Sequence, residues 1–95
     1  MEVSRFRYPG DRNLIGNRVK EARLSENPPA TQKDILARLE NEGFIFDETV
    51  ISKIEKGTRG VNTIELFALA KVLKKTPNWL LDFDSLRQLY VADEK

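Results

Sequence analysis

The sequence predicts a small all-α domain built from five helices. Apolar residues recur at intervals of three and four, capping residues precede these stretches, and no stretch alternates apolar and polar residues long enough to indicate a strand. The 95 residues of the chain suffice for one domain and leave no room for two independent cores. We divide the chain into an N-terminal arm over residues 1–12, a domain over 13–81 and a C-terminal tail over 82–95.

Two helices are predicted in the first half of the domain. Asn13 is the expected N-cap of a helix that runs to about Ser25, and the prolines that begin at Pro28 end it, because a residue before proline leaves helical geometry. Thr31 caps the second helix, with Asp34 at the reciprocal position of a capping box. The residues expected on the two buried faces are Ile15, Val19 and Ala22, then Ile35, Leu36 and Leu39.

A third helix is predicted after a glycine and a short apolar connector. Gly43 offers a left-handed stop to the second helix, and we expect the connector, residues 44–46, to pack inward. Asp47 is the expected cap of a helix over 48 to about 56, which Gly57 terminates. The apolar residues of this helix that should face the core are Ile51 and Ile54.

Two more helices complete the predicted domain. Asn62 and Glu65 form a second capping-box pattern, and Thr76 followed by Pro77 opens a short fifth helix. The core side of the fourth helix carries Leu66, Leu69, Ala70 and Leu73. The tail has Phe83, Leu86, Leu89 and Tyr90 at helical spacing, which leaves a short sixth helix open.

The composition excludes several classes of function. The chain has no cysteine and no histidine, so it lacks disulfides, thiolate metal sites and the commonest residues of nucleophilic and zinc chemistry. We therefore expect a protein that is not an enzyme and that has no metal, other cofactor or small-molecule ligand. The 16 basic and 15 acidic residues nearly cancel, so any binding of nucleic acid must rest on local charge.

The sequence also lacks the features of a membrane or exported protein. No apolar run approaches the roughly 20 residues that span a bilayer. The first residues, Met1 to Arg5, have no apolar core of the kind that signal peptides contain. We expect a cytoplasmic protein without a membrane partner.

Taken in order, several stretches resemble the Cro/repressor-type (XRE-like) helix-turn-helix domains of bacteria and their phages. The resemblance runs from about Ile15 to Leu81, and its turn between the second and third helices is longer than in the compact phage repressors. It implies a five-helix lambda-repressor-like domain whose third helix enters the major groove of DNA. The stretches that carry it are Arg18 to Arg23, Thr31-Gln32, Ile51 to Gly57 and Glu65 to Leu73.

The outer face of the third helix supplies the expected base contacts. A major groove about 12 Å wide admits one helix, whose entering face must be free of core contacts. The resemblance assigns base contacts to Glu48, Thr49 and Lys53, and the methyl groups of Thr49 or Val50 suit a thymine methyl. Lys53 can donate to guanine and Glu48 can accept from cytosine, although Glu48 equally suits a favourable charge on the first turn of a helix.

Other residues are expected to bind phosphate or to brace the domain. By resemblance, Gln32 binds a phosphate and supports the third helix, and helix N-termini suit phosphate. Arg23 and Glu55 match family positions that form a partly buried salt bridge between the first and third helices. The remaining expected phosphate contacts are Ser52, Lys56, Thr58 and Arg59, for which solvated side chains are the alternative.

These observations lead to a predicted function and one alternative. The chain is expected to be a sequence-specific regulator, a repressor that binds a palindromic operator in double-stranded DNA as a homodimer. Basic and aromatic side chains alternate over residues 5–8. This pattern indicates either an arm that packs its rings on the domain or an arm that contacts DNA. The alternative function is an antitoxin-like or partner-binding module, which the near-neutral charge and the acidic tail favour.

The expected dimer surface lies on the fifth helix and the tail. Its apolar residues exceed what one small domain buries, and exposed apolar patches usually mark an interface. The alternative is a tail that covers its own core and leaves a monomer. The residues of the expected surface are Trp79, Leu80, Phe83, Leu86, Leu89 and Tyr90.

Overall fold

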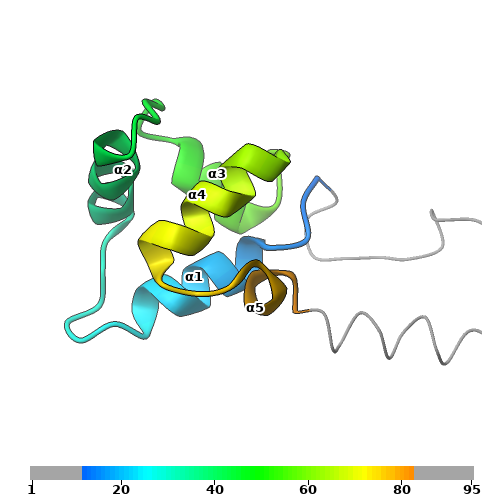
Figure 1. Ribbon diagram of the computed structural model, residues 1–95, viewed down its shortest axis with the longest axis horizontal. Coiled ribbons are helices and arrows are strands. Elements are labelled where there is room, and N and C mark those ends of the chain that lie inside the picture. Colours follow the sequence, from blue (N-terminus) through cyan, green and yellow to red (C-terminus); the bar gives the residue numbers. More distant parts are fainter. Residues whose placement is uncertain (1–11, 83–95) are drawn as a thin grey trace, which may run out of the picture.

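The computed structural model describes residues 12–82, which form a compact all-helical domain (Figure 1). The prediction of an all-α domain with five helices is confirmed for this part of the chain. The arm up to Asp11 and the tail residues from Phe83 onward, with the expected interface residues they carry, lie outside the described residues. The helices are α1 (Gly16–Leu24), α2 (Gln32–Asn41), α3 (Val50–Lys56), α4 (Thr63–Leu73) and α5 (Pro77–Leu81).

The five helices enclose one core. Helix α1 packs against α3, α4 and α5, whereas α2 packs against α3 and α4, as the crossing of the helices in Figure 1 illustrates. Leu36 and Leu66 are half-buried at the edge of the core. The predicted core residues that are buried are Ile15, Val19, Ala22, Ile35, Leu39, Ile51, Ile54, Leu69, Ala70 and Leu73.

Close contact between α1 and α3 depends on a glycine. A Cβ atom added at Gly16 would lie 2.9 Å from the carbonyl oxygen of Glu55 and would overlap the carbonyl of Ile54 still more strongly. Because only glycine lacks this atom, the first turn of α1 can rest directly on the backbone at the end of α3. This contact positions the helix that carries most of the candidate site.

Three of the predicted N-caps are confirmed. The Thr31 hydroxyl accepts from the Asp34 backbone N–H at 3.0 Å, and the Asp34 carboxylate accepts from the Thr31 N–H at 2.9 Å. Asn62 and Glu65 form the same reciprocal pair at the start of α4. The Thr76 hydroxyl accepts from the backbone N–H of the residue three positions later. Such caps satisfy backbone donors that a helix leaves free.

The start of α1 differs from the prediction. The helix begins at Gly16, and the N-cap position belongs to Ile15, which makes no side-chain cap bond. The Asn13 carboxamide oxygen instead accepts from the N–H groups of Ile15 and Gly16 at 2.9 and 2.8 Å. Its nitrogen donates to the carbonyl groups of Ile54 and Arg59 at 3.1 and 2.7 Å. Asn13 therefore ties the chain to the end of α3 and forms a turn before the helix.

The connection between α2 and α3 also differs. Helix α3 begins at Val50, not at residue 48, because the Asp47 carboxylate accepts from the N–H of Thr49 and holds a turn there. Gly43 adopts a left-handed φ of 93°, as predicted for the end of α2. The prediction that the whole connector packs inward is wrong for Ile45, whose side chain is 80% exposed. Its two phenylalanine neighbours are half-buried.

Within residues 12–82, none of the helices combines the length and the apolar character needed to cross a membrane.

Candidate nucleic-acid interface

Helix α3 presents one face to the core and another to solvent. Ile51 and Ile54 are buried, as predicted, but so is Val50, at 5% exposure. A side chain held in the core cannot reach a base edge, so the prediction of a base contact by Val50 is wrong. Val50 precedes Ile54 by four residues and therefore lies on the same buried face of α3, whatever the residue at which the helix begins.

Three of the predicted base-contacting residues remain on the outer side. Glu48, Thr49 and Lys53 are exposed, the first two in the turn before α3 and the third one turn into the helix. The Thr49 hydroxyl donates to the Asp47 carboxylate at 2.7 Å. Hydrogen bonds from the Thr49 hydroxyl and N–H lower the pKa of Asp47, which stays ionised at neutral pH. Thr49 consequently keeps its methyl group and an acceptor oxygen for other contacts.

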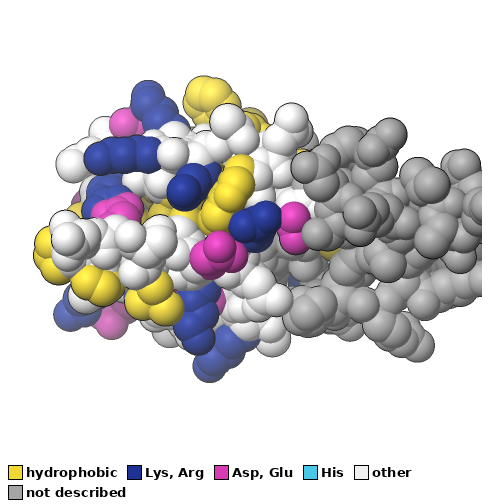
Figure 2. All heavy atoms as spheres, turned by 90° about the horizontal axis from the view of Figure 1, so that it is seen from below, with side chains coloured by type: hydrophobic (Ala, Val, Ile, Leu, Met, Phe, Trp, Pro, Cys, Tyr) yellow, Lys and Arg dark blue, Asp and Glu magenta, His cyan; other side chains and the backbone are white. Residues whose placement is uncertain are grey.

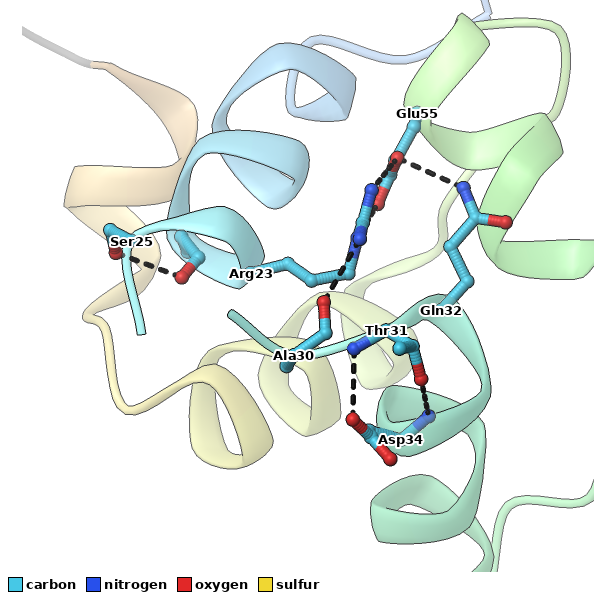
Figure 3. A network of polar contacts seen from close by, with 8 residues as sticks. Arg23, Ser25, Ala30, Thr31, Gln32, Asp34 and Glu55 are labelled. Carbon is cyan, nitrogen blue, oxygen red and sulfur yellow. Dashed lines mark hydrogen bonds and ion pairs between the residues drawn. The ribbon is translucent and has the colours of Figure 1, made fainter. Parts of the chain in front are cut away.

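A buried ion pair joins α1 to α3, as predicted (Figure 3). Arg23 Nε and Nη2 donate to the two Glu55 carboxylate oxygens at 2.7 and 3.0 Å, and Nη1 donates to the Ala30 carbonyl at 2.9 Å. The two side chains are 10% and 5% exposed. The hydrogen bonds that the Arg23 guanidinium donates to Glu55 raise the pKa of Arg23. This geometry fixes the end of α3 relative to α1 and to the segment before α2.

Gln32 adds α2 to the same network. Its side-chain nitrogen donates to Glu55 at 3.1 Å, so the first residue of α2 is bonded to α3 (Figure 3). The predicted bracing of α3 by Gln32 therefore has a direct geometric basis. The predicted contact of Gln32 with phosphate is untested and stays a prediction.

The other expected phosphate contacts lie on α3 and in the loop that follows it. Lys56 and Thr58 are exposed, and the Thr58 hydroxyl donates to the Lys53 carbonyl at 3.3 Å. Ser52 is half-buried on α3. Gly57 ends the helix with a left-handed φ of 79°, which turns the chain sharply at this point.

Arg59 is occupied in a way that the sequence did not indicate. Its guanidinium forms a bidentate pair with the Glu65 carboxylate at 3.0 and 3.1 Å, and Nη1 also donates to the Gly60 carbonyl. The hydrogen bonds raise the pKa of Arg59 and lower that of Glu65. Opposite charges at Arg59 and Glu65 are visible in the sequence, but they do not by themselves predict the pair. Glu65 also completes a capping box, and its contact with Arg59 depends on the path of the loop.

The side of the domain formed by α1 and α5 carries side chains of both charges (Figure 2). Figure 2 shows the side of the domain that lies lowest in Figure 1, where α1 and α5 run. On this side, basic and acidic side chains are interspersed and form no patch of one sign. The described part of this face therefore lacks the concentrated positive charge that a nucleic-acid interface favours (Figure 2).

Helix α5 offers less to the predicted dimer surface than expected. Leu80 is fully buried, so its predicted place in an interface is wrong. Trp79 is half-buried, with the Arg18 guanidinium 4.1 Å and the Lys75 ammonium 4.6 Å from its ring centre. Arg18 also pairs with Asp82 at 2.9 Å. The short helix packs against α1 and α4, with Leu80 in the core and Trp79 and Leu81 at its edge.

The exposed apolar side chains of the described residues lie elsewhere. Ile64 and Phe67 are each 65% exposed and stand three residues apart on α4, which places them on one face of that helix. The sequence contains a signal for this exposure, because both residues fall outside the expected core positions of α4. In the described part of the chain, no group of three or more acidic residues is arranged to hold a metal ion.

No family model matches the chain, and no curated protein or solved structure matches it significantly.

Proposed function

We propose that this protein is a transcriptional regulator that recognises a specific sequence in the major groove of double-stranded DNA. The observation that carries the proposal is the arrangement of α3. Its inward residues are buried, Lys53 is exposed on its outer side beside Glu48 and Thr49 in the preceding turn, and its end is braced by the Arg23–Glu55 pair. A rigid helix with a free polar face suits base readout, because direct readout needs side chains held at fixed positions.

The proposal divides the site between two kinds of contact. Lys53 donates to guanine, Glu48 accepts from cytosine, and the Thr49 methyl contacts a thymine methyl. Phosphate contacts fix the register of the protein on DNA without reading its sequence. The residues assigned to phosphate are Gln32, Ser52, Lys56 and Thr58.

Recognition of one site in a genome requires more than a single helix of seven residues. We therefore propose a homodimer on a palindromic operator, with two copies of α3 about 34 Å apart, one turn of DNA. The protein acts as a repressor in the cytoplasm, where it covers its operator. Trp79 and the tail residues Phe83, Leu86, Leu89 and Tyr90 form the proposed dimer surface.

The test is selection of bound sequences from a pool of random DNA duplexes. We expect recovery of a palindrome whose half-sites are one helical turn apart, and binding that weakens steeply as salt rises. Recovery of unrelated sequences, or binding too weak to titrate at low salt, would contradict the proposal. A duplex with shuffled half-sites is the matched control.

A second candidate function is a partner-binding module in which DNA binding is secondary or absent. The observation that favours it is the exposed pair Ile64 and Phe67 on α4, because apolar side chains gathered on one face suit contact with another protein. This function requires no duplex preference, so the same selection experiment separates the two.

A further inference from the structure

The connection between α2 and α3 sets the position of two proposed base contacts. Glu48 and Thr49 both lie in this connection, which spans residues 42–49 and contains no helix. Backbone hydrogen bonds hold its ends: the Phe44 N–H donates to the Leu39 carbonyl at 2.9 Å, and the Val50 N–H to Asp47 at 3.2 Å. The middle of the connection must be held by side chains.

Phe46 supplies the side-chain contact in the middle. Its ring lies nearly parallel to that of Phe44, with centroids 6.2 Å apart and planes 14° apart. The guanidinium carbon of Arg59 lies 5.4 Å from the centre of the Phe46 ring. A cation within about 6 Å of an aromatic ring centre is attracted to its face, so Arg59 holds Phe46 from the side of the loop after α3.

Arg59 is itself held by two other parts of the domain. The Glu65 carboxylate, 15% exposed, binds the guanidinium through two oxygens and also accepts from the Asn62 N–H at the start of α4. The Arg59 carbonyl accepts from the Asn13 side chain at 2.7 Å. Arg59 therefore links the turn before α3 to α4 and to the segment before α1.

This arrangement suits phosphate binding poorly. A phosphate would have to displace the Glu65 carboxylate or share the guanidinium with it, and two anions close together repel each other. The Arg59–Glu65 pair is also neutral as a unit, so it offers little net charge for the release of counterions from DNA.

We propose that Arg59 is a positioning residue for base readout, in place of the phosphate contact predicted from the sequence. Held by Glu65, it fixes Phe46 and thereby the turn that carries Glu48 and Thr49. This inference rests on the proposed function. Lysine cannot replace arginine in this role, because it lacks the planar fork that binds a carboxylate through two hydrogen bonds and stacks on a ring.

The first experiment compares binding to the selected duplex and to a random duplex across a range of salt concentrations. We expect Arg59→Lys and Glu65→Gln each to reduce the preference for the selected duplex roughly tenfold, with the salt dependence unchanged. Glutamine keeps an oxygen that can accept from the Asn62 N–H, so the cap of α4 is retained. Lys56→Gln is the control for a phosphate contact: it should lower the salt slope by about 0.9 and leave the preference intact.

The outcome that would overturn the proposal is equally specific. If Arg59 bound phosphate, Arg59→Lys would keep the preference, and Glu65→Gln would strengthen binding to both duplexes by freeing the guanidinium. That pair of results would return Arg59 to the phosphate contacts.

A second measurement uses the protein without DNA. We expect Arg59→Lys to accelerate amide hydrogen exchange in residues 43–49, while the buried amides of α1 and α2 exchange as in the wild type. Unchanged exchange in the turn would refute the positioning role. If the wild type prefers no duplex, the proposed function fails, whereas hydrogen exchange still decides whether Arg59 holds the turn.

Discussion

Glu55 is the residue on which three helices converge. It accepts from Arg23 of α1 and from Gln32 of α2 while it belongs to α3. Its side chain is 5% exposed, so its charge is compensated by hydrogen bonds and not by water. The sequence placed opposite charges at the right positions of two helices, and the structure adds the amide of Gln32 as a third partner.

Removal of either partner of the Arg23–Glu55 pair should strongly destabilise the domain. We expect Arg23→Met and Glu55→Gln each to lower the free energy of unfolding by about 3–5 kcal/mol, because each leaves a buried partner uncompensated. The double variant should lose less than the sum of the two. Urea denaturation of the four proteins measures this coupling, and strictly additive losses would show that the pair does not act as a unit.

Two lysines one turn apart should differ in their effect on DNA binding. Lys53→Ala should weaken binding to the selected duplex more than to random DNA, by about 1–3 kcal/mol, because Lys53 is assigned to a base. Lys56→Ala should weaken both alike, because it is assigned to phosphate. Titration of both duplexes at fixed salt measures this difference. An equal loss on both duplexes for Lys53→Ala would remove it from the base contacts.

At the scale of elements, the starts of α2 and α4 follow the same chemistry. In each, a side chain before the helix and an acidic side chain three residues later exchange hydrogen bonds with the backbone. Hydrogen bonds from Thr31 lower the pKa of Asp34, and those from Arg59 and then Asn62 lower that of Glu65. A carboxylate with a lowered pKa in the folded state stabilises the fold while it is ionised.

These two helix starts should make the domain sensitive to acid. Because the folded-state pKa values of Asp34 and Glu65 are lowered, their contribution is fully present above the ordinary carboxyl range, near pH 4, and is lost as the pH falls through the lowered values. We expect Glu65→Gln to flatten the fall of stability on the acid side. The urea concentrations at the midpoint of unfolding, recorded for both proteins between neutral pH and pH 3, measure this loss of stability. A wild-type slope in the variant would contradict the role of Glu65.

At the scale of the whole molecule, assembly is the property that decides between the two candidate functions. Because Leu80 is buried, the proposed dimer surface rests on the half-buried Trp79 and on the tail, whereas α4 exposes Ile64 and Phe67. These two exposed apolar residues on one helix offer a second surface for a partner. A dimer formed through the tail and a complex formed through α4 therefore depend on different residues.

The proposed dimer should form through the tail. We expect the intact chain to sediment as a dimer at micromolar concentration and the chain without residues 84–95 to sediment as a monomer with weaker DNA binding. Phe67→Ser is the control and should leave the dimer intact. A monomeric intact chain would refute the homodimer, and loss of the dimer only in Phe67→Ser would move the interface to α4.

The sequence by itself determined the features that local chemistry controls. The caps at Thr31, Asn62 and Thr76, the glycine stop at Gly57 and the buried stripes of the helices follow from residue type and spacing within one or two turns. The ion pair between α1 and α3 was predicted from the family resemblance, which indicates that the two helices contact each other. Residue spacing alone does not indicate this contact.

Only the tertiary structure decided which way the ends of the helices face. Leu80 is buried because α5 packs against α1 and α4, and local spacing does not encode this packing. The second partner of Glu65 likewise depends on how the loop after α3 folds back. Both contacts join residues of separate segments of the chain, whereas residue spacing determines only which side chains share a face of one helix.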